Sequence, residues 1–189
     1  MKVPYHSYRR IAPLLFMFGL ISQVFVLGVG RIIRGTVSRI DLFGFQIQPS
    51  EFMKVALVLM LAWALAKYQT ISWRQLGATA ILLGLPVALV MQEPDLGMAA
   101  LMATVWFGMI VVFGMPWRII ALVMLVGVLA FGTAWQTVLL DYQKERILTF
   151  LHPAADPLRS GYNVTQSIIA LGSGQLFGRG LGHGPQSQL

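Results

Sequence analysis

The chain has no cysteine and very little charge. Without thiols, disulfide bonds, iron–sulfur clusters and thiolate zinc sites are excluded. Charged residues make up 11% of the 189 positions, less than half of the share of about 25% that soluble domains carry. That is too little to cover a water-exposed surface, and 57% of the residues are hydrophobic. The composition therefore predicts an integral membrane protein that forms one helical domain.

Negative charge is the scarcer kind. Seven Asp and Glu residues stand against fourteen Lys and Arg residues, so the formal net charge is +7. Because apolar stretches separate the basic residues, contact with anionic membrane lipids is expected and nucleic-acid binding is not. The three histidines, His6, His152 and His183, lack metal-ligand spacing, and the glycine-rich end of the chain matches no nucleotide-binding motif. No metal site is predicted from the residues.

Five apolar runs predict an all-α polytopic helical bundle. The membrane spans are expected near residues 11–29, 52–68, 76–91, 98–113 and 119–137. Between the first two spans we expect an extracytoplasmic loop with a short re-entrant or hairpin-like piece. The apolar alternation from Ile40 to Ile47 is too short to be assigned as a strand. Residues 138–189 are polar and rich in glycine, and we expect them to form one large extracytoplasmic loop.

Charge also bears on the topology. Lys2, Arg9 and Arg10 precede the first span, which favours a cytoplasmic N-terminus. With five spans, residues 138–189 then lie outside. All seven acidic residues fall on the predicted outer side, although eight of the fourteen basic residues fall there too. A cleaved export signal is not expected, because the first apolar run is long and no small-residue cleavage site follows it.

Ionisable residues gather where the predicted spans begin or end. Ser50 is predicted to cap the second span, with Glu51 in its first turn and Lys54 three residues later on the same face. Glu93 and Asp95 follow the third span. Charges at membrane depth are costly, so a functional role is one interpretation. A salt bridge of Lys54 with Glu51 or Glu93 that only holds the spans together is the other.

The loop at 138–189 holds the candidate catalytic group. Asp156 lies between Pro153 and Pro157, which rule out a continuous helix there. Its carboxylate is either a turn acceptor or a general base that takes the proton of an attacking hydroxyl. Arg146 and Arg159 lie in the same loop, and their guanidinium groups suit either phosphate oxygens or lipid headgroups.

Four blocks of residues resemble the SEDS (shape, elongation, division and sporulation) family of bacterial cell-wall glycosyltransferases. They are QPSEFMK at 48–54, QEPDLG at 92–97, YQKERILTFLHPAADP at 142–157 and GYNVTQSIIALGSGQLFGRGLGHGPQSQL at 161–189. The last block is more similar to the RodA-type branch than to the FtsW-type branch. Two positions depart from the family pattern: Arg39-Ile40 stands where Arg-Trp is usual, and Glu93 differs from the usual QPDLG block.

The resemblance implies that residues 1–189 are one partial SEDS domain. It would cover the third to seventh of about ten spans in a fold similar to polyprenyl-dependent transferases, lacking both ends of the family. Such a fragment is expected to be inactive by itself. The whole protein would polymerise lipid II, which carries undecaprenyl pyrophosphate, at the outer face of the bacterial cytoplasmic (inner) membrane, with inversion. A lipid II flippase, or a non-catalytic scaffold for a class B penicillin-binding protein, is the alternative.

The resemblance also implies roles for individual residues. Asp156 matches the essential loop aspartate of the family and is the expected catalytic base. The residues expected to bind the substrate are Arg39, Lys54, Arg146, Arg159 and Gln166. Glu51, Glu93 and Asp95 are expected to form structural charge pairs. The expected partners are lipid II, membrane lipids and a class B penicillin-binding protein. No cofactor is firmly expected, beyond a possible magnesium or manganese ion on the lipid pyrophosphate.

Overall fold

The computed structural model describes residues 5–29, 31–33, 36–42, 45–66, 68, 72–155, 161–175, 177–180 and 183–184; at 5–8 and 29–46 it describes the backbone alone. The chain divides into two compact units. The first unit is Met1–Val123 and the second is Met124–Leu189. Each is described by itself.

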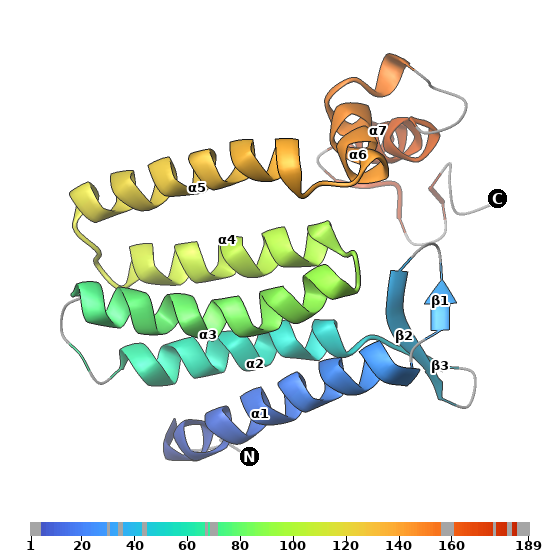
Figure 1. The fold of residues 1–189 in the computed structure, drawn as a ribbon. Helices are drawn as coiled ribbons and strands as arrows, with labels where there is room; N and C mark the ends of the chain where they lie inside the picture. Colours follow the sequence, from blue (N-terminus) through green and yellow to red (C-terminus); the bar gives the residue numbers. More distant parts are fainter. Residues whose placement is uncertain are drawn as a thin grey trace. The chain divides into compact units, whose positions relative to one another are not determined.

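In the described residues, five long helices lie over the five predicted spans (Figure 1). They are α1 (Tyr5–Val29), α2 (Pro49–Leu65), α3 (Trp73–Gln92), α4 (Leu96–Val112) and α5 (Trp117–Thr137). By length and hydropathy, α1, α3 and α5 could each cross a membrane, and α4 is a shorter apolar helix. The predicted helical class is confirmed, whereas the number of spans that cross the membrane stays a prediction.

A small antiparallel sheet lies between α1 and α2 in the chain. Its strands are β1 (Arg31–Ile33), β2 (Thr36–Leu42) and β3 (Phe45–Ile47), in the order β1-β2-β3. Ile40 pairs with Ile47 and Leu42 with Phe45 across β2 and β3. The expected hairpin-like piece is therefore present, whereas the interpretation that assigned no strand here was wrong. The sheet forms because neighbouring short strands pair with one another. The alternation within one segment does not reveal such pairing.

The core of the first unit lies among α1, α2, α3 and α4. Met53, Leu57 and Leu61 of α2 recur every four residues and are fully buried, so they form one apolar stripe along the helix. Val90 of α3 and Met102 of α4 are also fully buried and belong to the same cluster. These four helices are therefore held by packing of apolar side chains, as expected for a membrane bundle.

The start of α2 differs from the sequence prediction. The N-cap is Gln48 and the first helical residue is Pro49, so Ser50 is not the cap. Proline favours the first helical position because its fixed φ suits the helix and its missing N–H is not needed there. Ser50 consequently lies within the first turn, where its side chain is fully buried.

The second unit includes two helices within the range predicted as a loop. They are α6 (Asp141–Leu151) and α7 (Tyr162–Gly174), and the short 3-10 turn η1 (Pro153–Ala155) contacts both. Pro153 follows directly after the end of α6, in agreement with the predicted helix break. The region is therefore partly helical rather than a simple loop.

Candidate functional site

The start of α2 carries an ion pair of two predicted site residues. Lys54 Nζ lies 2.7 Å from Glu51 Oε2, three residues away on the same helix face. The Lys54 side chain is 23% exposed and the Glu51 side chain is 54% exposed, so water partly screens the pair. Of the two pairings left open for Lys54, the structure forms the one with Glu51.

Asp95 joins the beginnings of two helices. One of its carboxylate oxygens, Oδ1, accepts a hydrogen bond of 3.0 Å from the backbone N–H of Met98, which caps α4. The other, Oδ2, accepts a bond of 3.4 Å from the side-chain amide of Gln48, the N-cap of α2. The QPSEFMK and QEPDLG blocks, which lie far apart in the sequence, therefore meet at this end of the first unit.

Glu93 lies in the turn after α3 and is only 1% exposed. Neither of its carboxyl oxygens has a hydrogen-bond partner among the described residues. Burial, and secondarily the charge of Asp95, raises the pKa of the Glu93 carboxyl from 4.5 to about 7. A carboxyl with this pKa is about half protonated at neutral pH, unlike the ionised partner of a salt bridge that the sequence suggested.

Two further buried polar side chains lie toward the same end of the bundle. Gln23 of α1 and Ser50 of α2 are fully buried, and the described structure provides their side chains with no hydrogen-bond partner. Gly19 lies directly against Met53, and α1 and α2 run in opposite directions (Figure 1). Gln23 lies one turn after Gly19, and Ser50 lies one turn before Met53. The two side chains therefore face the same interface between α1 and α2. The sequence signal was present, because Gln23 is one of few polar residues in an apolar run.

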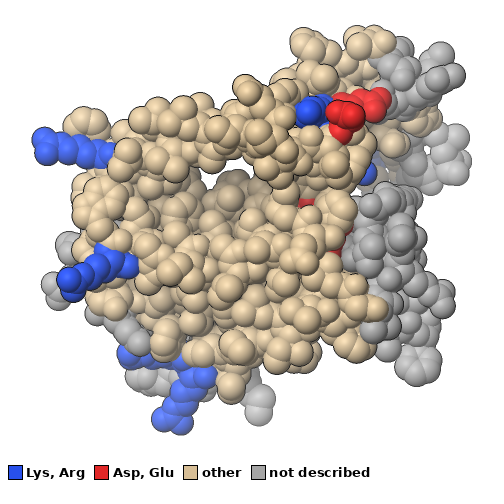
Figure 2. Space-filling view, viewed as in Figure 1, with Lys and Arg blue, Asp and Glu red and all other residues tan. Residues whose placement is uncertain are grey.

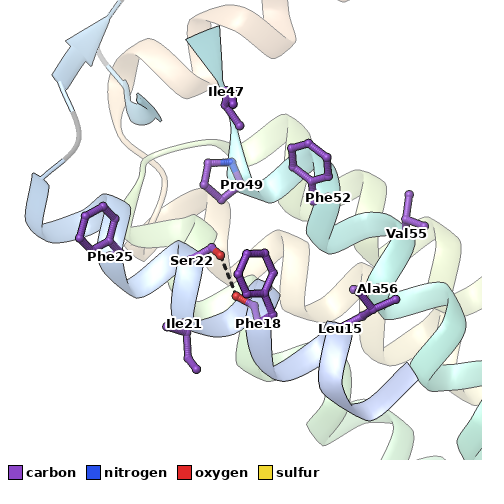
Figure 3. A pocket seen from close by; sticks show the side chains of 11 residues that line it. Leu15, Phe18, Ile21, Ser22, Phe25, Ile47, Pro49, Phe52, Val55 and Ala56 are labelled. Atoms are coloured by element: carbon purple, nitrogen blue, oxygen red, sulfur yellow. Dashed lines mark hydrogen bonds between the residues drawn. The ribbon is translucent and has the colours of Figure 1, made fainter. Parts of the chain in front are cut away.

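An apolar cavity opens between α1 and α2, and sequence analysis did not predict it (Figure 3). Its volume is about 670 Å³. Aromatic rings from both helices line it: Phe18, Phe25 and Phe52. The hydroxyl of Ser22 also lines the cavity but donates to the carbonyl oxygen of Phe18 at 2.7 Å. The cavity therefore offers no unused polar side-chain group at Ser22 and suits a hydrocarbon chain.

In the second unit, the described site residues lie on two helices. Arg146 is exposed on α6, and its guanidinium carbon lies 5.8 Å from the centre of the Tyr142 ring. Gln143, on the same helix, is buried and accepts a 3.1 Å hydrogen bond from the backbone N–H of Leu140. Gln166 lies half-buried on α7. Buried Gln143 thus fixes the start of α6, and Arg146, one turn later, is open to solvent.

Several predicted residues cannot be placed. Asp156 and Arg159 lie outside the described residues. Arg39 lies on β2, but its side chain is not described. Their roles stay predictions. No group of three or more His, Cys, Asp or Glu residues in the described ranges could hold a metal ion.

Comparison with known proteins gives whole-chain matches. Residues 1–189 match the family of cell cycle proteins that comprises FtsW, RodA and SpoVE. Peptidoglycan glycosyltransferase MrdB of Escherichia coli (strain K12) is 35% identical over 189 residues, which are 100% of this chain and 51% of that protein. The probable peptidoglycan glycosyltransferase FtsW of Allochromatium vinosum is 33% identical over 192 residues, covering 99% of this chain and 48% of that protein.

A solved structure shows the same fold. In the structure described as "Structural coordination of polymerization and crosslinking by a peptidoglycan synthase complex", one chain matches with a TM-score of 0.74 and 34% identity. The match covers 89% of this chain and 50% of that chain. The chain spans about half the length of the curated relatives it matches.

Proposed function

Because the chain belongs to the FtsW, RodA and SpoVE family of cell cycle proteins, we propose that it polymerises lipid II into peptidoglycan glycan strands. The observation that carries this proposal is the match of the whole chain to a relative named peptidoglycan glycosyltransferase. We assign it to elongation and cell shape, as in the RodA-type branch, rather than to division. The reaction takes place at the outer face of the bacterial cytoplasmic membrane, with the N-terminus in the cytoplasm.

The proposed reaction is an inverting glycosyl transfer. A sugar hydroxyl of one lipid II attacks the anomeric carbon of another, the bond from that carbon to the pyrophosphate oxygen breaks, and undecaprenyl pyrophosphate leaves. Asp156 accepts the hydroxyl proton as general base. The leaving group carries the bond electrons away on a phosphate oxygen, so the transition state gains negative charge next to the lipid.

Basic residues stabilise that charge in the proposal. Arg146 can act here because its guanidinium is exposed and its planar fork suits phosphate oxygens. Lys54 would exchange its ion pair with Glu51 for a phosphate oxygen, and Arg39, Arg159 and Gln166 would contribute further contacts. A magnesium or manganese ion on the pyrophosphate would add to this neutralisation.

The proposed protein partner is a class B penicillin-binding protein, which crosslinks the new glycan. The support is the likeness to a chain of a complex described as coordinating polymerisation and crosslinking. Lipid II transport across the bilayer is the second candidate. It is favoured by Glu93, whose buried carboxyl could change protonation near neutral pH during a transport cycle.

One experiment separates the two candidates. The full-length protein, purified together with a class B penicillin-binding protein, is given lipid II in detergent, where no bilayer has to be crossed. We expect glycan polymer, and we expect Asp156→Ala to abolish it. The matched control is Asp141→Ala, an exposed acidic residue of the same unit, which should leave polymer formation unchanged. Equal polymer from the Asp156 variant would refute its role as base, and no polymer from any variant would favour transport.

A further inference from the structure

A second cavity lies at the opposite end of the first unit from Glu93, between the end of α2 and the start of α3. Its volume is about 720 Å³, within the range of about 300–1,000 Å³ typical of ligand pockets. Tyr68, Arg74 and Gln75 line it near the helix ends. Further along the two helices its lining is mostly apolar: Met60, Ala64, Leu65, Ala78, Ile81 and Leu82. The hydroxyl of Thr79 also lines it but donates to the carbonyl oxygen of Leu76 at 3.0 Å. The cavity therefore has a polar end and an apolar body.

Two exposed aromatic side chains predict that the polar end of this cavity lies at the depth of the lipid headgroups. Trp73, the first residue of α3, is 60% exposed, and Tyr68 is 46% exposed. Exposed Trp and Tyr at the ends of membrane helices favour the interface between hydrocarbon and water. Since α3 could cross a membrane over residues 73–92, its apolar part extends from that interface into the hydrocarbon.

Positive charge dominates this end of the first unit. Arg9, Arg10, Arg74 and Arg118 are all exposed at it, and the described residues here include no Asp or Glu. Figure 2 shows basic side chains projecting at this end of the first unit, with no acidic side chain beside them. The two described ion pairs, Lys54–Glu51 and Lys144–Asp141, do not involve these arginines. Arg74 is the one of the four that lines the cavity.

We propose that this cavity binds one anionic phospholipid of the cytoplasmic leaflet, with Arg74 on the phosphate and an acyl chain along the apolar body. This inference goes beyond the proposed polymerase activity and concerns the opposite face of the membrane. Basic pockets between helices on the cytoplasmic side suit anionic headgroups. The positive end of the α3 helix dipole adds to the attraction for an anion. A soluble phosphate compound would fill the polar end but not the apolar body.

The test measures which lipid stays bound. The protein is released from nanodiscs of equal parts phosphatidylglycerol and phosphatidylcholine, and retained lipids are identified by native mass spectrometry. We expect phosphatidylglycerol to be retained selectively, and Arg74→Gln to lower its retention about fivefold. Arg118→Gln is the matched control, because Arg118 is exposed at the same end but does not line the cavity. It should retain the lipid as the unmodified protein does.

A second variant tests the apolar body. Ala78 is exposed and lines it, so Ala78→Trp should fill the body and displace the lipid while Arg74 is still present. Equal loss in the Arg74 and Arg118 variants would mean general attraction to the basic surface and would overturn the proposal. Retention without headgroup preference would do the same. Displacement of the lipid by millimolar glycerol phosphate would show a phosphate site rather than a lipid site.

Stability gives an independent measurement. A cation in the first turn of a helix opposes the helix dipole, so Arg74 is unfavourable there unless an anion binds. We therefore expect Arg74→Gln to raise the unfolding temperature in phosphatidylcholine nanodiscs and to lower it in phosphatidylglycerol nanodiscs. The same sign in both lipids would contradict the proposal, because a purely structural arginine would not respond to the headgroup.

Discussion

In the described residues, the two ends of the first unit differ in whether their unpaired polar side chains are buried or exposed. Where α2 begins and α3 ends, Gln23, Ser50 and Glu93 are buried and have no hydrogen-bond partner among the described residues. At the other end, Arg74 and Arg118 are exposed. An exposed charge costs little, whereas a buried carboxyl without partners is destabilising, and more so when it is ionised. We therefore expect pH to change the stability of the end that contains Glu93. We expect lipid headgroups and salt to change the interactions of the end that contains Arg74 and Arg118.

The largest effect on stability is expected at Glu93. Its pKa in the folded protein is about 7, compared with 4.5 when unfolded, so the folded state holds a proton that the unfolded state loses. The contribution of Glu93 to stability is therefore greatest below about pH 4.5, falls as the pH rises to about 7, and is constant above that. The total loss is about 3 kcal/mol at most. Denaturant unfolding in detergent between pH 4 and pH 8 measures it.

Glu93→Gln removes the titrating group and keeps its shape. We expect the fall in unfolding free energy across this pH range to be absent in the variant, and the variant to be the more stable protein above pH 7. Asp141→Asn is the control, because Asp141 is exposed and its removal should leave the pH dependence intact. A wild-type protein whose stability does not change between pH 4.5 and 7 would show that Glu93 is solvated or paired.

Two variants of Asp95 separate its role as a helix cap from the effect of its charge on Glu93. Asp95→Ala removes the cap of α4 and the bond from Gln48, and it should cost about 1 kcal/mol of unfolding free energy. Asp95→Asn keeps a good capping side chain but removes the charge. We expect it to preserve most of the stability and to lower the pKa of Glu93 modestly, since burial is the larger cause of the shift. An Asn variant as unstable as the Ala variant would mean that charge, rather than capping, is the contribution of Asp95.

The sequence predicted the long helices well because length and composition largely determine them. The span predicted at 98–113 corresponds to α4 (Leu96–Val112), and the span predicted at 119–137 corresponds to α5 (Trp117–Thr137). The sheet from Arg31 to Ile47 was missed because its strands are short and depend on each other. The helices α6 and α7 were missed because their polar and glycine-rich residues obscure the helical pattern.

The site was predicted less completely. The sequence identified Glu51, Lys54, Glu93 and Asp95 as notable, because charge is rare in this chain. It left open which carboxylate pairs with Lys54. The spacing within one helix turn favours Glu51, and only tertiary packing determines that Glu93 is buried. The apolar cavity between α1 and α2 depends on how two helices approach and could not be predicted from either run alone.

The smallest effect is expected for the ion pair of Glu51 and Lys54. Both side chains are partly exposed, so Glu51→Gln should cost about 0.3–0.5 kcal/mol at low salt and less at high salt. A double-mutant cycle with Lys54→Met isolates the coupling between the two side chains. Arg118→Gln, at the opposite end and stacked only against Trp117 in the described contacts, should show no such coupling to Glu51. A coupling above about 1 kcal/mol that resists salt would show that the pair is shielded from water and that this end buries charge as well as Glu93.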